Sequence, residues 1–374
     1  MNILNIYKTV IFLLIFLHPF VVYAERTIPK NPIVQAVDVK FNEESLKGYF
    51  VIIDARTNEE KSLHLQKKSV DGTVIVFFQG HAQRPDDAYA FTSKLALQSK
   101  SGIVIVPVCD TPFGKNKEFR GDKGKIVILM EIVRYALSFY AMDVKNYSSH
   151  NIPITINHKT IPVDESTTKV EISAVGWSHG AILARMTAST FTSVKNLVQI
   201  CPAGFIQWND NQCVASCCLL SSFNWEGIRI STEIFKGNGG EVLSASWGIT
   251  KGITGDTIRS CNSCIYGNFN LLKLFRPYKD ISDATSVAMY PVKNLSSIVV
   301  IFGEDDSLFN PKDIVGKNYA SPENTDIFFK TFYPEAIGIS KLHLFILPGK
   351  HIAPVIFYKE YALHTLKYIN EYNN

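Results

Sequence analysis

The sequence predicts an α/β protein in which helices cover both faces of a mostly parallel central sheet. One observation is a series of short, uniformly apolar runs, such as 73–78 and 103–108, which is typical of parallel strands buried on both faces. A second is that helical patterns separate these runs, as in other proteins with parallel sheets. A third is that this alternation stops over 202–291 and then resumes, which predicts a folded segment inserted into one large domain.

The expected elements follow one another in a regular order. Two early strands, at 37–41 and 49–54, are expected to form an antiparallel edge of the sheet. Buried strands are predicted at 73–78, 103–108, 167–175, 196–201, 297–302 and 343–347. The spacing of apolar residues predicts helices at 88–99, 125–143, 181–190 and 355–372. An alternating stretch at 152–163 predicts a surface hairpin with His158 at its tip.

Residues 1–24 have the pattern of a secretory signal peptide. Lys8 supplies the positive flank, the run 10–17 is apolar, and a small-residue cleavage site ends at Ala24. The alternative, a membrane anchor, would need about 20 apolar residues, but the apolar run is interrupted at Pro19. The sequence therefore predicts cleavage of the signal and export, with a secreted or periplasmic location.

Composition and charge narrow the range of partners. The formal net charge of +4 falls to +3 when Lys8 is removed with the signal, and no block of Lys or Arg stands out, so no nucleic-acid partner is expected. No later apolar run is long enough to span a bilayer, so no stable membrane insertion is expected after cleavage. The mature chain is expected to form one core from 25–201 and 292–374, with 202–291 as an inserted cap.

All seven cysteines lie beyond the signal, and five of them cluster in the inserted segment. Export to an oxidising compartment makes disulfides the expected state of this cluster, although the sequence does not fix their pairing. The cluster consists of Cys213, Cys217, Cys218, Cys261 and Cys264. A zinc site built on Cys261 and Cys264, with partners among the other three, is the alternative. The odd count leaves a thiol unpaired, and buried Cys109 or Cys201 suits that state.

A Gly-x-Ser-x-Gly motif lies between a predicted strand and a predicted helix. Its residues are Gly176, Trp177, Ser178, His179 and Gly180. In this context the motif describes a tight turn that strains the backbone of the serine and projects its side chain above the sheet edge. Both glycines have a steric reason, because a Cβ at either position would collide where the helix folds back on the strand. Ser178 is therefore a candidate nucleophile.

A nucleophilic serine needs a base to accept its proton and an acid to orient that base. In a parallel sheet these groups are expected just past the carboxyl ends of strands. Gly303-Glu304-Asp305-Asp306 and Gly349-Lys350-His351 follow two such strands. His343 is the competing histidine, but it falls at the start of a strand, at the other end of the sheet.

The order Ser, Asp, His and the two turns resemble the α/β-hydrolase superfamily, over 48–372 without the insertion. The resemblance implies that Ser178 is the nucleophile, Asp306 the acid and His351 the base, with Asp305 as the reserve acid. It also implies an oxyanion hole formed by the backbone N–H of His179 and that of His81. His81 lies in Gln79-Gly80-His81, where the superfamily often has His-Gly-x. Arg120-Gly121-Asp122 is interpreted as a turn.

These features predict an exported serine hydrolase that cleaves a small-molecule or lipid carboxylic ester through an acyl-enzyme, without a metal or organic cofactor. The enzyme alternative is a peptidase or amidase that uses the same residues. An alternative of another class is a non-catalytic binding protein that uses the cysteine-rich cap for recognition and retains a vestigial site. The superfamily hosts many reactions, so the fold does not fix the substrate.

Overall fold

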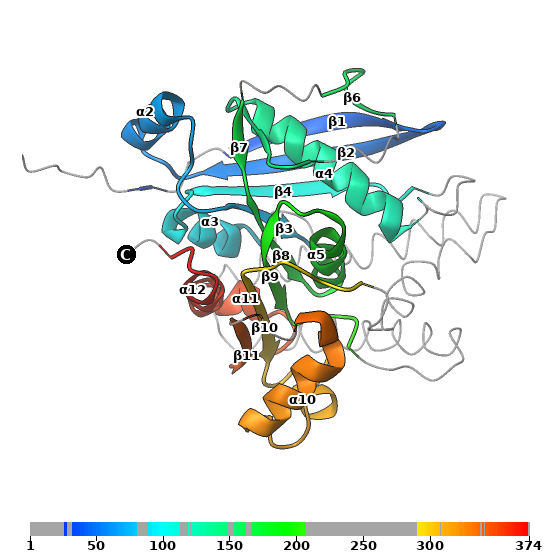
Figure 1. Ribbon diagram of the computed structural model, residues 1–374, viewed down its shortest axis with the longest axis vertical. Helices are drawn as coiled ribbons and strands as arrows, with labels where there is room; N and C mark the ends of the chain where they lie inside the picture. Colours follow the sequence, from blue (N-terminus) through cyan, green and yellow to red (C-terminus); the bar gives the residue numbers. More distant parts are fainter. Residues whose placement is uncertain are drawn as a thin grey trace, which may run out of the picture.

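The central feature of the molecule is a nine-stranded, mostly parallel sheet (Figure 1). The computed structural model describes residues 26–27, 32–80, 88–112, 119, 121–147, 153–161, 167–205, 290–306, 308–319, 321–336, 339 and 341–372. Within these ranges the strand order is β11-β10-β9-β8-β3-β4-β2-β1-β6. Strands β4, β3, β8, β9, β10 and β11 run parallel to one another, while β2 is antiparallel to β4 and β1 is antiparallel to β2 and β6.

The strands of this sheet are β1 Ile33–Phe41, β2 Glu44–Asp54, β3 Val74–Phe78, β4 Ile103–Cys109, β6 Ile154–Ile156, β8 Ile172–Trp177, β9 Val194–Ile200, β10 Ser297–Gly303 and β11 Leu342–Leu347. A separate parallel pair consists of β5 Met142–Val144 and β7 Thr168–Val170. The helices are α2 Asn58–Lys67, α3 Tyr89–Gln98, α4 Asp122–Ser138, α5 His179–Thr190, α9 Pro311–Ile314, α10 Pro322–Phe332, α11 Ala353–Ile356 and α12 Tyr358–Tyr368.

Helices cover both faces of the sheet. Successive side chains of each strand point to opposite faces, so a single strand contributes to the core on both sides. In β3, Val74, Val76 and Phe78 belong to a core cluster shared with α4 and α5. The alternate residues Ile75 and Phe77 belong to a second cluster shared with α3 and α12. Figure 1 shows these two pairs of helices on either side of the sheet. The predicted fold class is therefore confirmed, including the antiparallel edge formed by β1 and β2.

Several predicted elements have different bounds in the structure, and the helix predicted at 355–372 is divided into α11 and α12. The helix predicted to reach residue 143 ends at Ser138, because Ala141 takes a positive φ of 53° and the chain then enters β5. The nucleophile strand predicted from residue 167 is divided into β7 and β8. The predicted hairpin at 152–163 has its tight turn at His158, because Ile156 and Lys159 exchange backbone hydrogen bonds of 2.9 Å and 3.0 Å. Its first strand, β6, also pairs with β1 and so extends the sheet edge.

The structure describes the core on each side of the predicted cap, with Phe205 as the last described residue before it and Tyr290 as the first after it. Both are attached to the same part of the core. The Phe205 ring lies 4.9 Å from the ring of Phe332, and Arg185 donates hydrogen bonds to the carbonyl oxygens of Tyr290 at 3.1 Å and Phe332 at 2.6 Å. The predicted signal peptide and most of the predicted cap, with its five cysteines, lie outside the described residues.

Candidate active site

Ser178 occupies the sharp turn between β8 and α5. Its backbone has φ 57° and ψ −124°, a conformation that non-glycine residues rarely adopt and that costs roughly 1–3 kcal/mol. The turn is held by the Ser178 N–H, which donates to the carbonyl of Ile200 at 2.9 Å. The flanking glycines are required by close backbone contacts. A Cβ on Gly176 would lie 2.1 Å from the carbonyl oxygen of Gly180, and one on Gly180 would lie 2.0 Å from that of Phe78.

His351 connects Ser178 to Asp306 through two hydrogen bonds. Its Nε2 lies 2.9 Å from Ser178 Oγ, and its Nδ1 lies 2.9 Å from Asp306 Oδ2. A carboxylate can only accept, so Nδ1 carries the proton and Nε2 of the neutral ring is left to accept the serine hydroxyl proton. The three residues expose only 3%, 1% and 6% of Ser178, Asp306 and His351 respectively, so water competes little with these bonds.

Backbone contacts bring the loops of Asp306 and His351 together. The N–H of Asp305 donates to the Gly349 carbonyl at 3.0 Å, and the N–H of Glu304 donates to that of Leu347 at 2.8 Å. The loops approach so closely that a Cβ on Gly303 would lie 2.6 Å from the Gly349 carbonyl oxygen. The pairing of β10 with β11 thus continues into the turns that carry the acid and the base.

The acid side chain is fixed on both oxygens. While Oδ2 of Asp306 faces His351, its Oδ1 accepts the backbone N–H groups of Leu308 at 2.9 Å and Phe309 at 3.0 Å. The reserve candidate Asp305 is exposed, and the carboxylate that contacts His351 is that of Asp306. His343 lies at the start of β11, at the other end of this strand from His351, as expected.

Trp177 holds the backbone of His351. This fully buried side chain donates its indole N–H to the backbone carbonyl of His351 at 3.0 Å. The residue next to the nucleophile therefore fixes the backbone of the histidine that the nucleophile contacts. No local pattern predicts this bond, because residues 177 and 351 are brought together only by the order of the strands.

His179 begins α5, where the backbone N–H groups of the first turn have no acceptor within the helix. The imidazole of His179 contacts another residue, since its Nε2 lies 2.8 Å from Oδ2 of Asp122. Both side chains are buried. Asp122 is the first residue of α4, so this pair joins the starts of two helices beside the serine. The second predicted oxyanion donor, His81, lies outside the described residues.

The interpretation of Arg120-Gly121-Asp122 as a turn was incomplete, because it gave Asp122 no contact with the site. Gly121 does make the turn, with φ 68°, and Asp122 then begins a helix and bonds His179. A carboxylate in the first turn of a helix is a general signal for a helix start. That signal could have placed Asp122 at the start of α4, but not beside His179.

The buried thiol of Cys201 lies behind the acid. Potential metal-ligand atoms of Cys201, Asp306 and His351 all lie within 4.8 Å of one another. Asp306 and His351 already use their facing atoms to bond each other, so this cluster does not fit a metal ion as well as it fits a hydrogen-bonded chain. Cys109 and Cys201 are both unpaired and buried, as expected of thiols left outside the disulfide cluster.

Within the described ranges, no helix has both the length and the apolar character needed to cross a bilayer.

No protein-family model matches the sequence, and comparison with curated proteins gives no match. Several solved structures are similar in fold. A hydrolase from Pseudomonas aeruginosa has a TM-score of 0.48 and 10% identity, covering 89% of this chain and 98% of its own. An esterase from Pyrococcus furiosus has a TM-score of 0.40 and 12% identity, covering 93% and 97%. A thermophilic esterase from Thermogutta terrifontis has a TM-score of 0.45 and 10% identity, covering 91% and 98%.

The sheet order and the strand-turn-helix unit around Ser178 are those expected of an α/β hydrolase. The mostly parallel sheet with helices on both faces is therefore the architecture that the predicted resemblance implies.

Proposed function

We propose that this protein is a serine hydrolase that cleaves carboxylic esters through an acyl-enzyme. The observation that carries the proposal is the buried hydrogen-bonded chain from Ser178 through His351 to Asp306, with two contacts of 2.9 Å. A serine hydroxyl alone is a weak nucleophile, and a histidine held in the correct tautomer is what activates it. Each of the three residues makes at least one further hydrogen bond, through the backbone of Ser178 and His351 and through Oδ1 of Asp306.

In the proposed first step, Ser178 Oγ attacks the carbonyl carbon of the ester while its proton passes to His351 Nε2. The bond to the alcohol oxygen then breaks, and His351 returns the proton to the departing alcohol. In the second step a water molecule gives a proton to Nε2 and attacks the acyl carbon, and the acid leaves as Ser178 recovers its proton. Asp306 stabilises the positive charge on His351 in both steps without being protonated itself.

The negative charge that develops on the carbonyl oxygen requires hydrogen-bond donors. We propose the backbone N–H of His179 as the first donor, supported by the partial positive charge at the start of α5. The N–H of His81 is proposed as the second. Such donors act strongly because they are already oriented before the charge appears.

We propose an ester rather than an amide as the substrate because an alcohol is the easier leaving group and makes fewer demands on the timing of proton transfer. We also propose that the protein is exported after cleavage behind Ala24, and that the cysteine cluster forms disulfides in the oxidising compartment.

The test of the activity is Ser178→Ala. Turnover of short p-nitrophenyl esters should fall by roughly 10⁴-fold or more, because the attacking oxygen is removed while the remaining contacts stay in place. Thermal unfolding and circular dichroism should show that the variant is folded. A fluorophosphonate probe should label the parent protein at Ser178 and leave the variant unlabelled.

Unchanged ester turnover in a folded Ser178→Ala variant would contradict the proposal. Absence of labelling in the parent protein would favour the vestigial binding protein instead. A panel of matched amides and esters, graded by acyl length, separates esterase from amidase activity.

A further inference from the structure

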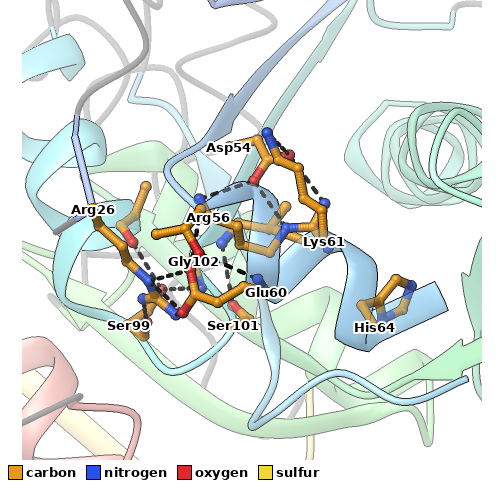
Figure 2. Close-up of polar contacts among 12 residues, drawn as sticks. Arg26, Asp54, Arg56, Glu60, Lys61, His64, Ser99, Ser101 and Gly102 are labelled. Atoms are coloured by element: carbon orange, nitrogen blue, oxygen red, sulfur yellow. Dashed lines mark hydrogen bonds and ion pairs between the residues drawn. The ribbon is translucent and has the colours of Figure 1, made fainter. Parts of the chain in front are cut away.

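A polar pocket lies between α2 and the turn that precedes β4, beside the N-terminal segment (Figure 2). Its volume is about 80 Å³. The lining residues that bear on its chemistry are Arg26, Arg56, Glu60, His64, Lys67 and Lys100. None of them has a role in the proposed ester cleavage.

The pocket and Ser178 lie at opposite ends of the parallel strands. Ser178 follows the carboxyl end of β8, whereas the pocket residue Ser101 precedes the amino end of β4. Since β3 is parallel to both β4 and β8, the carboxyl end of β8 and the amino end of β4 lie at opposite ends of the strands. Strand β2 runs the other way and pairs Asp54 with Ile103, which brings Arg56 and α2 to the same end as Ser101. The pocket is therefore separate from the candidate active site.

The guanidinium of Arg56 is only partly used by the protein. Its Nε and Nη2 donate to the two carboxylate oxygens of Asp54 at 2.9 Å and 3.0 Å. Its Nη1 is buried and has no hydrogen-bond partner among the described residues, and the whole residue is 7% exposed. A buried, charged donor without a partner is rare in folded proteins and points to a missing water or ion.

His64 offers a second unsatisfied atom in the same pocket. Its Nδ1 lies 2.9 Å from the carbonyl oxygen of Ser69, so this nitrogen carries the proton and donates. Its Nε2 is buried without a partner in the described part of the chain, and the residue is 6% exposed. The neutral ring can accept from a ligand hydroxyl at Nε2, and the protonated ring can donate to an oxyanion there.

The acidic residues nearest to these groups are already engaged. Asp54 binds Arg56. Glu60 binds Arg26 at 2.6 Å and accepts the backbone N–H of Thr57 at 2.7 Å, and Figure 2 shows Arg26 and Glu60 side by side. Lys67 and Lys100 are exposed at the rim and form no ion pair with any described residue. The lining as a whole has four Arg or Lys residues against Glu60 and Asp71, which favours an anion.

We propose that this pocket binds a small oxyanion group, a phosphate or a carboxylate. An apolar cavity of about 150 Å³ holds benzene, so about 80 Å³ has room for a group of a few heavy atoms. A planar guanidinium donor and a histidine nitrogen suit the oxygens of such a group. A larger molecule that carries the group extends past the lysines at the rim.

The first experiment is isothermal titration calorimetry of the full-length protein with sodium phosphate and with sodium acetate, against sodium chloride at equal ionic strength. The main variant is His64→Asn, because the amide nitrogen of Asn can still donate to the Ser69 carbonyl while Nε2 is lost. Lys100→Ala removes a charge at the rim without removing a buried contact. Lys312→Ala, an exposed lysine on α9, is the matched control.

We expect phosphate or acetate to bind the parent protein and the Lys312→Ala variant equally, and to bind His64→Asn and Lys100→Ala at least fivefold more weakly. Thermal unfolding without anion shows whether each variant is folded. Absence of binding to the parent protein at millimolar anion, or equal binding to all four proteins, would overturn the proposal.

The source of the anion is distinguished by sedimentation with vesicles. If the ligand is a lipid headgroup, vesicles that contain phosphatidic acid should carry the parent protein but not His64→Asn into the pellet, and phosphatidylcholine vesicles should carry neither. If the ligand is a soluble anion, free phosphate or acetate should bind and neither kind of vesicle should sediment the protein. Ester hydrolysis should be the same in all variants, since the pocket and Ser178 lie at opposite ends of the parallel strands.

Discussion

At the scale of single residues, Ser178 shows how the fold holds a reactive side chain in a costly position. Its backbone conformation is unfavourable for any residue with a Cβ. The cost is offset because both neighbouring glycines allow backbone contacts closer than a side chain would permit, and because Ile200 accepts its N–H. The backbone of this turn thus places the hydroxyl within 2.9 Å of His351 Nε2.

Asp122 is expected to act as a positioning residue, because it holds the imidazole of His179, whose backbone N–H is the proposed oxyanion donor. Replacing Asp122 with Ala should lower kcat for a p-nitrophenyl ester by roughly 10- to 100-fold through misplacement of that donor. KM should change little, since the ground-state carbonyl depends less on the oxyanion hole than the transition state does.

Asp122→Asn is the matched control, because its carbonyl oxygen can still accept from His179 Nε2. It should retain most of the activity. A parallel fall of kcat in both variants, or a change confined to KM, would contradict the positioning role. Melting temperatures separate either outcome from a loss of folded protein.

The residues of the site differed in how far the sequence identified them. Ser178, Asp306 and His351 each carry a local signal, because each lies in a glycine-containing turn after an apolar strand, and the structure brings all three together. Asp122 and Trp177 act through partners distant in the chain, at His179 and His351. Such contacts depend on strand order, which no local pattern contains.

At the scale of elements, a buried ionic network attaches α4 to β5. Arg134 donates to Asp143 at 2.8 Å and to Glu131 at 3.0 Å, and the hydroxyl of Tyr147 donates to Glu131 at 2.7 Å. Burial raises the pKa of Glu131 despite the charge of Arg134. Burial also acts to raise the pKa of Asp143, but the bonds and charge of Arg134 outweigh it and lower that pKa.

Replacing Arg134 with Met should destabilise the protein by about 3–5 kcal/mol, because buried Glu131 would lose its cation and Asp143 would keep only Lys169, at 3.1 Å. Urea unfolding measures the change. Lys145→Ala is the control, since it breaks an exposed pair with Glu171 and should cost no more than about 1 kcal/mol. An equally small loss for Arg134→Met would show that the network is not a major support of α4.

The parallel strands were predictable because their apolar runs reflect burial on both faces. Helix α2 was not predicted, because its apolar residues Leu63 and Leu65 are exposed rather than aligned on one buried face. A usable signal was present: Thr57 and Glu60 form a capping box, which marks a helix start without any hydrophobic pattern. Helix α10 was not predicted either, although it begins with Ser321 as N-cap and Pro322 in the first turn.

At the scale of the whole molecule, the described core contains two unpaired thiols that should not react with alkylating reagents in the native protein. Burial raises the pKa of the Cys109 thiol to about 12, and burial, followed by the charge of Asp306, raises that of Cys201. At pH 8 an ordinary thiol is about one quarter ionised, whereas one with a pKa near 12 is ionised to about one part in 10⁴.

Iodoacetamide at pH 8 should therefore leave Cys109 and Cys201 unmodified in the native protein and modify both after unfolding, as read by peptide mass spectrometry. If the proposed disulfides form, up to four of the five clustered cysteines should resist modification in both states until a reductant is added, and the one left over should be modified at least after unfolding. Modification of all five in the unreduced, unfolded protein would contradict the disulfides. Tight retention of zinc by the native protein would favour the metal-site alternative.

Export is a separate prediction about the whole chain. The protein isolated from the extracytoplasmic fraction should begin at Glu25, as determined by N-terminal sequencing, because cleavage is expected behind Ala24. Ala24→Arg, which places a large charged residue at the cleavage position, should leave the precursor uncleaved. A mature protein that still begins at Met1 would show that the segment is a retained anchor instead.

The attachment of Phe205 and Tyr290 to one small region around Arg185 and Phe332 has a further consequence. The chain between residues 205 and 290 therefore leaves the core and returns to it at one place, so a change in the length of that stretch need not displace a strand of the described sheet. Insertions or deletions inside it are expected to preserve the hydrogen bonds that join Ser178, His351 and Asp306.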